Sequence, residues 1–253
     1  MAFTIDLNAD LGEGFGRWTL TEDEALLSVV TSANVACGFH AGDPSTMRRV
    51  CELAVEHGVR IGAQVSYRDL AGFGRRAMEV PADELADEVA YQIGALDVFA
   101  RAAGARVSYV KPHGALYNRT VTDEEQASAV VTGVVLAGGQ LPVLGLPGSL
   151  LLRAAAAAGL EPVAEAFADR AYTAQGGLVP RSIPGSVLHE PAAVLGQALS
   201  LAARQSVTAV TGERLPVTAR SICLHGDTPG AAQAGLRVRR ELIRAGVELR
   251  AFT

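Results

Sequence analysis

The segment VKPHGALYN, residues 110–118, places a lysine and a histidine directly after an apolar run. Pro112 has no amide hydrogen to donate to a sheet, so we expect it to end a strand and to turn the next residues onto the rim, where Lys111 and His113 face a common cavity. A lysine there can neutralise the carboxylate or phosphate of a substrate, and a histidine can transfer a proton near neutral pH. We therefore predict that Lys111 binds a substrate and that His113 is catalytic, with a purely structural histidine as the alternative.

A second group of polar residues lies in the segment DLNADLGEGFGRW, residues 6–18, which ends a predicted strand and runs into a glycine-rich turn. Asp6, Asn8 and Asp10 alternate to one face of that strand, and a buried polar face needs partners or a ligand. We predict that Asp10 is catalytic and that Asn8 and Glu13 bind a substrate. Carboxylates on a mobile surface loop are the alternative. The glycines do not fit the dinucleotide-binding pattern.

The segment SANVACGFHAGDP, residues 32–44, follows with Asn34 and His40. A carboxylate at Asp43 could orient His40 for proton transfer, or the two could bind a metal together. Asp43 stands directly before a proline, however, which is equally typical of a helix N-cap. We predict a catalytic His40 and a substrate-binding Asn34. Cys37 could be a nucleophile but is more typical of a small core residue.

The carboxyl-terminal half holds two further groups. Asp169 and Arg170 follow one predicted strand and His225 lies near the end of another, and we predict that Asp169 and His225 are catalytic. Arg170 and Arg181 suit bidentate binding of a carboxylate, although each alone could be a solvated surface residue. Asp227 precedes a predicted helix whose first amides could hold an anion, and we assign it to substrate binding, with a plain helix cap as the alternative.

The elements that position these residues alternate along the chain, short β-rich runs with longer amphipathic stretches, which predicts parallel strands with crossover helices. Roughly seven or eight such units in about 250 residues is the size of a closed, TIM-like (β/α) barrel. A doubly wound open sheet gives the same alternation, but a barrel brings all its strand ends to one rim. We therefore predict an α/β barrel with one domain over residues 1–253 and a hairpin within 208–219. Strands are expected at 3–8, 32–39, 59–66, 107–113, 141–146, 162–168, 221–227 and 247–252, and helices at 43–58, 81–104, 123–137, 148–159, 190–205 and 229–246.

Composition narrows the class of protein. The chain has 253 residues, 49% of them hydrophobic, and a formal net charge of -5. It shows no basic stripe for nucleic acid and no apolar run long enough to cross a membrane. The three cysteines form no CxxC pair, so neither a disulfide framework nor a structural zinc site is indicated. We expect a globular cytoplasmic protein that acts on a small molecule.

Taken together, the segments DLNADLGEGFG, SANVACGFHAGDP, DLAGFGRR, VKPHGALYN, EAFADRAY and HGDTPGA resemble the LamB/YcsF family, in family order from about residue 4 to the carboxyl terminus. The resemblance implies a β/α barrel akin to the glycoside hydrolase/deacetylase superfamily. It also implies a role in ATP-dependent 5-oxoprolinase, which opens 5-oxo-L-proline (pyroglutamate) to L-glutamate, together with the partner subunits B and C. ATP would be a co-substrate of the complex, accompanied by Mg²⁺.

The chain itself has no GxxxxGK[ST] loop, so we expect the partner subunits to help phosphorylate the lactam oxygen and this chain to bind the lactam and assist ring opening. One alternative is a metal-dependent, carbohydrate-type deacetylase with Asp10, His40 and His113 as ligands. Another is a non-catalytic protein that binds 5-oxoproline for its partners.

One position departs from the family pattern. Many members carry a histidine-proline pair where this chain has Gln64 and Val65. Glutamine can still form a hydrogen bond with a substrate amide, so we assign Gln64 to substrate binding. The missing histidine and the lack of short ligand spacing lead us to expect no metal in this chain.

Overall fold

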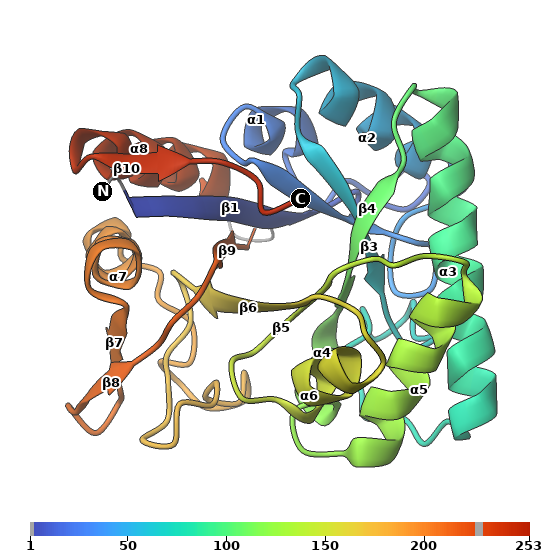
Figure 1. Ribbon diagram of the computed structural model, residues 1–253. Helices are drawn as coiled ribbons and strands as arrows, with labels where there is room; N and C mark the ends of the chain where they lie inside the picture. The colour runs from blue at the N-terminus through green and yellow to red at the C-terminus, as the bar shows by residue number, and fades with distance from the viewer. Residues whose placement is uncertain (1–2, 226–229) are drawn as a thin grey trace.

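The strands form a closed barrel (Figure 1). The computed structural model describes residues 3–225 and 230–253. Within these residues seven parallel strands pair in the order β1–β2–β3–β4–β5–β6–β9, and β9 pairs in turn with β1. This last pairing closes the sheet, which confirms the barrel and excludes the open sheet. The strands are β1 (Phe3–Leu11), β2 (Ser32–Ala36), β3 (Arg60–Val65), β4 (Val107–Pro112), β5 (Val143–Gly145), β6 (Pro162–Phe167) and β9 (Ser221–Leu224).

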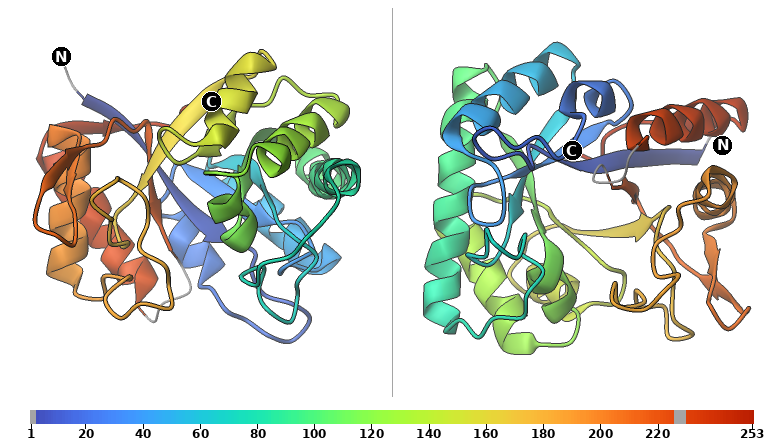
Figure 2. Two further views of the ribbon diagram at one scale, coloured as in Figure 1. Left: turned by 90° about the horizontal axis from the view of Figure 1, so that it is seen from below. Right: turned by 180° about the vertical axis from the view of Figure 1, so that it is seen from behind.

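Helices surround the strands on the outside of the barrel (Figure 2). The long helices α3 and α5 pack against each other along one flank. Six helices occur where the sequence predicts them, whereas α1 and α4, each of about one turn and a half, are too short to show a helical period. The described helices are α1 (Asp23–Leu27), α2 (Pro44–Glu56), α3 (Ala82–Ala102), α4 (Gly114–Arg119), α5 (Glu124–Leu136), α6 (Leu150–Ala157), α7 (Pro191–Arg204) and α8 (Ala231–Arg244).

Among the residues that the structure describes, three short strands lie outside the closed ring. The last predicted strand, β10 (Val247–Leu249), pairs with the first described residues of β1. The predicted hairpin is present as β7 (Ser206–Thr208) and β8 (Arg214–Pro216), which pair antiparallel to each other. No helix among the described residues is both long and apolar enough to span a membrane.

Local sequence explains where α2 begins. The Asp43 carboxylate accepts hydrogen bonds from the backbone amides of Ser45 and Thr46, and Pro44 occupies the first helical position. Asp43 is therefore an N-cap, and its carboxylate is used by the helix rather than by His40. Cys37 is buried within the hydrophobic core, as its alternative assignment predicted.

Strand β1 shows how the barrel separates its two faces. Ile5, Leu7 and Ala9 belong to the hydrophobic core. The alternating residues Asp6 and Asn8 are also buried, but they make polar contacts inside the barrel. A parallel strand covered on both faces thus carries apolar residues toward the helices and polar residues toward the barrel axis.

Candidate active site

A cavity of about 520 Å³ opens where the strands end. Its walls come from residues at or just after the carboxyl ends of β1, β4, β5, β6 and β9, the end of a β/α barrel at which active sites form. The polar residues that line it include Asp10, Lys111, His113, Arg170, Arg181 and His225.

Lys111 lies at the centre of the charged residues. Its Nζ is 3.3 Å from Asp10 Oδ1 and 3.1 Å from Glu165 Oε2. Burial lowers the pKa of Lys111, but the neighbouring carboxylates outweigh burial and hold the pKa well above its ordinary value. The same ammonium holds the pKa of Asp10 well below its usual range despite burial. The two residues therefore form a buried ion pair.

Lys111 and His113 both line this cavity, as we predicted, and strand β4 ends at Pro112. Both side chains are nevertheless buried, since Lys111 is 2% exposed and His113 is 4% exposed.

Two residues of this cluster were not predicted as site residues. Glu165 is buried, and burial raises its pKa against the effect of Lys111. The Cys223 thiol accepts a 3.3 Å hydrogen bond from Lys111 Nζ. One signal in the sequence pointed here: Lys111 is the single lysine among 22 basic residues.

Asn8 and Asn34 are not among the described residues that line the cavity. They contact the charged cluster from inside the barrel instead. Asn34 Nδ2 donates to Asn8 Oδ1 at 2.7 Å and to Asp10 Oδ1 at 2.9 Å. The Tyr109 hydroxyl donates to Asn34 Oδ1 at 2.7 Å, and its ring fits because Gly62 has no side chain. Our assignment of the two asparagines to substrate contact is therefore replaced by a positioning role.

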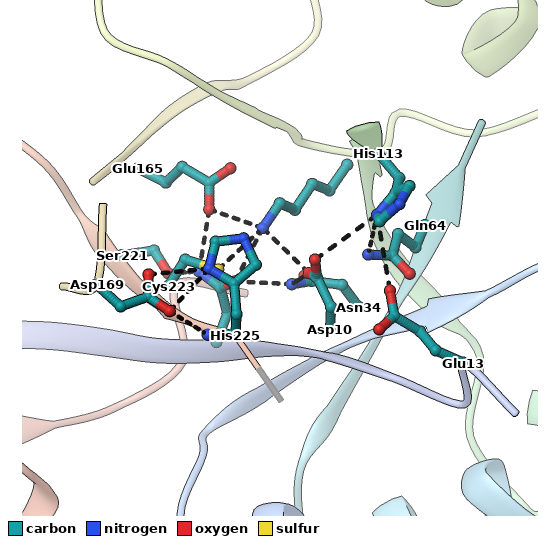
Figure 3. Close-up of polar contacts among 12 residues, drawn as sticks. Asp10, Glu13, Asn34, Gln64, His113, Glu165, Asp169, Ser221, Cys223 and His225 are labelled. Carbon is teal, nitrogen blue, oxygen red and sulfur yellow. Dashed lines mark hydrogen bonds and ion pairs between the residues drawn. The ribbon is translucent and has the colours of Figure 1, made fainter. Parts of the chain in front are cut away.

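His225 and Asp169 form a close pair on the other side of the cavity (Figure 3). His225 Nδ1 is 2.9 Å from both carboxylate oxygens, and the His225 backbone amide donates to Oδ2 at 3.0 Å. Burial opposes ionisation of Asp169, but His225 outweighs it, and the pKa of Asp169 is lowered. The carboxylate holds the hydrogen on Nδ1, which leaves Nε2 to exchange a proton with a molecule in the cavity.

His113 is fixed by the protein on both ring nitrogens. Nε2 is 3.0 Å from the Phe73 carbonyl, which can only accept, so Nε2 carries the hydrogen. Nδ1 is 3.0 Å from Gln64 Nε2 and 3.7 Å from Asp10 Oδ2. Phe73 has a left-handed φ of 55°, a strained conformation for a residue with a side chain, and this turn directs its carbonyl at His113.

His40, Glu13 and Gln64 lie behind His113 and do not appear among the described residues that line the cavity. Figure 3 shows Glu13 and Gln64 directed at His113. The His40 ring stacks on the His113 ring with 4.0 Å between centroids. Direct substrate contact, which we predicted for Glu13 and Gln64, does not fit this placement.

The two predicted arginines differ. Arg170 donates from Nε to the Ser186 carbonyl and from Nη2 to the Val179 carbonyl, so it fastens the loop after β6. Burial and the nearby Arg181 lower the pKa of Arg170 to about 10, which leaves it charged at neutral pH. Arg181 is exposed and lines the cavity, where it can bind an anion. The predicted residue Asp227 lies outside the described residues.

The sequence and the fold both match known proteins. The model of the LamB/YcsF family matches residues 5–253. A relative from Streptomyces coelicolor, named as the A subunit of 5-oxoprolinase, is 75% identical over 248 residues, which cover 98% of this chain and 99% of the relative.

Solved structures extend the comparison. A crystal structure of a lactam utilization protein from Thermus thermophilus superposes with a TM-score of 0.93 at 42% identity, and covers 98% of this chain and 100% of that one. A family 4 carbohydrate esterase from Streptomyces lividans reaches a TM-score of 0.51 at 12% identity, over 99% of this chain and 93% of the esterase. The second likeness extends to the fold alone.

Proposed function

Because the chain belongs to the LamB/YcsF family, we propose that it is the A subunit of an ATP-dependent 5-oxoprolinase. In this proposal it binds 5-oxo-L-proline in the cytoplasm and assists its hydrolysis to L-glutamate in a complex with partner subunits B and C. The support from comparison is the family match together with a relative of that name at 75% identity over almost the whole chain.

The cavity suits a small anion with an amide. 5-Oxoproline is a five-membered lactam that carries one carboxylate. Arg170 and Arg181 both line the cavity, so positive charge meets the incoming carboxylate. Lys111 lies deeper, where its ammonium can contact the lactam oxygen.

The observation that carries the catalytic part is the His225–Asp169 pair at the cavity wall. Hydrolysis adds a water oxygen to the lactam carbonyl carbon, breaks the carbon–nitrogen bond and leaves a proton on the released amine. His225 Nε2 would take the proton from the attacking water and deliver it to the lactam nitrogen as the bond breaks. Asp169 would hold the imidazole in place and stabilise its protonated form.

ATP would be a co-substrate of the complex as a whole. Amide resonance makes direct attack on an unstrained lactam slow. Transfer of the terminal phosphoryl group of ATP to the lactam oxygen, with release of ADP, would remove that resonance. After water has opened the ring, a second water would release the phosphoryl group from the new carboxyl group as inorganic phosphate. Because the sequence holds no GxxxxGK[ST] loop, we assign help with this phosphorylation, and the accompanying Mg²⁺, to the partner subunits.

The test is reconstitution with and without the partners. The purified chain should bind 5-oxoproline by calorimetry but release no glutamate with ATP alone, and adding subunits B and C should restore ATP-dependent release. Arg181→Ala should weaken binding by about 1.5 to 3 kcal/mol, the value of a hydrogen bond to a charged group. The exposed Arg106→Ala is the matched control.

Glutamate release by the chain alone would contradict the division of labour. Full activity of subunits B and C without this chain would contradict its role altogether. A complex that hydrolyses 5-oxoproline normally with His225→Ala would reduce this chain to a binding component.

A further inference from the structure

We propose that Glu13, His40 and His113 form a binding site for a divalent first-row transition-metal cation of the zinc type, behind the inner wall of the cavity. The three residues come from the turn after β1, the loop after β2 and the end of β4. All three are buried. This site reverses our expectation from the sequence that the chain holds no metal.

The spacing of the ligand atoms fits one small cation. One ligand atom from each residue lies within 4.8 Å of the others. Glu13 Oε1 is 3.8 Å from His40 Nε2 and 3.7 Å from His113 Nδ1. Two ligands at about 2.1 Å from a tetrahedral Zn²⁺ lie roughly 3.4 Å apart, so shifts of a few tenths of an ångström would complete these two edges of the coordination shell.

His40 supplies an independent reason to expect a ligand. Its side chain is 0% exposed, yet neither ring nitrogen has a hydrogen-bond partner among the described residues. Buried polar atoms without hydrogen bonds are energetically unfavourable and rare in folded proteins, so this imidazole calls for a partner. Its Nε2 faces Glu13 Oε1.

His113 is arranged as metal-binding histidines usually are. Its Nε2 hydrogen is given to the Phe73 carbonyl, which fixes the tautomer and leaves the lone pair on Nδ1, the nitrogen that faces Glu13.

Gln64 and Asp10 complete the surroundings. Gln64 Nε2 lies 3.0 Å from His113 Nδ1, the nitrogen that carries the lone pair. The other amide atom, Gln64 Oε1, has no hydrogen-bond partner among the described residues. A half-turn of the amide would replace the donor with this oxygen and so release the lone pair to a cation. Asp10 is paired with Lys111, and Glu13 is the carboxylate that lies close to both His40 and His113.

The donor set selects the class of cation. Two imidazoles and one carboxylate favour Zn²⁺ or Co²⁺ over Mg²⁺ and Ca²⁺, which prefer oxygen ligands. A cation held here would supply Lewis acidity next to Asp10 and His113, both of which line the cavity.

The experiment measures binding on the full chain and does not depend on 5-oxoprolinase activity. Chelator-treated protein should take up about one Zn²⁺ per chain by equilibrium dialysis and elemental analysis, and its melting temperature should rise with Zn²⁺ concentration. Co²⁺ should show visible absorption bands on binding, and millimolar Mg²⁺ should not displace it.

Two variants test the ligands. Glu13→Gln and His40→Gln should each bind Zn²⁺ at least about 100-fold more weakly, because losing even an outer-shell partner costs 10- to 100-fold. The exposed His57→Gln should bind like the wild type. Circular dichroism identifies a variant that does not fold, and the other variant then decides.

No saturable Zn²⁺ or Co²⁺ uptake by the folded wild-type chain overturns the site, as does unchanged affinity in every folded ligand variant. If glutamate release fails while Zn²⁺ binding behaves as described, the proposed function fails and the metal site stands.

Discussion

Two groups of histidines near the cavity differ in the hydrogen-bond partners of their buried imidazole rings. His225 is held by the Asp169 carboxylate at 2.9 Å. His40, completely buried, has a hydrogen-bond partner on neither ring nitrogen among the described residues. An imidazole fixed by a carboxylate suits proton transfer, whereas neutral imidazoles that converge on one point suit a metal ion. Histidine content alone therefore does not distinguish the two chemistries, but the partners of each ring do.

The buried carboxylates repeat the contrast. Asp10 has the Lys111 ammonium, and its pKa is held well below the usual range. Asp6, deeper in the barrel, is held by the hydroxyls of Thr31, Ser32 and Ser221. Burial outweighs these hydrogen bonds and raises the pKa of Asp6 to about 6. Asp10, beside the ammonium, thus loses its proton more readily, whereas Asp6, among hydroxyls, retains its proton more strongly.

The largest expected effect comes from removing the carboxylate that distinguishes His225 from His40. Asp169→Asn should slow glutamate release by the reconstituted complex by roughly 100-fold to 10,000-fold, the usual value of a positioned acid or base. The melting temperature and Zn²⁺ affinity should stay near the wild-type values. Exposed Asp87→Asn is the matched control. Normal turnover in Asp169→Asn would remove the distinction between the two clusters.

Removing the cation between the buried carboxylates should have the next largest effect. Lys111→Met leaves Asp10 and Glu165 without their ammonium, and breaking a buried ion pair from one side lowers the free energy of unfolding by about 3 to 5 kcal/mol. Urea denaturation at neutral pH measures this as a lower midpoint with an unchanged slope. The exposed Arg106→Met should change little. Equal stability of the two variants would show that the buried pair is dispensable.

The smallest effect concerns the pH dependence of stability at Asp6. Its pKa is about 6 in the folded chain and 3.8 without burial, so the folded state binds the proton more tightly. The resulting stability is fully present below about pH 4 and is lost as pH rises through about 6, a difference of about 3 kcal/mol for two pKa units.

Asp6→Asn removes this titration. The unfolding free energy of the wild type minus that of the variant should fall by about 3 kcal/mol between about pH 4 and pH 7, as measured by urea denaturation. All other titrating groups are shared by the two proteins. A constant difference over this range would show that Asp6 is ionised throughout, like Asp10.

Much of the fold could be predicted because its signals are local. The alternation of strands and helices, the N-cap at Asp43 and the end of β4 at Pro112 each depend on a few neighbouring residues. The position of polar residues at successive strand ends was equally readable, and it led to Asp10, Lys111 and His225 at one cavity. The short helices α1 and α4 were missed because about one turn and a half shows no period.

Contacts inside the barrel between residues far apart in the sequence could not be predicted. Glu165 was not predicted as a site residue, because its role depends on Lys111, which lies 54 positions away in the sequence and reaches it inside the barrel. Likewise Glu13, His40 and His113 share no short spacing, and their convergence led us to reverse the prediction about metals.

The sequence by itself determined which segments become strands and helices and which strand ends carry reactive side chains, because those properties follow from local hydrophobic period, capping and chain stiffness. Only the tertiary structure decided which side chains are buried, which are paired and which lack a partner. The pairing of β9 with β1 closes the barrel and excludes water from its interior. Ion pairs and unsatisfied hydrogen-bonding atoms have large energies, and pKa values shift strongly, only where water is excluded. The chemistry of the site therefore depends on the closure of the barrel.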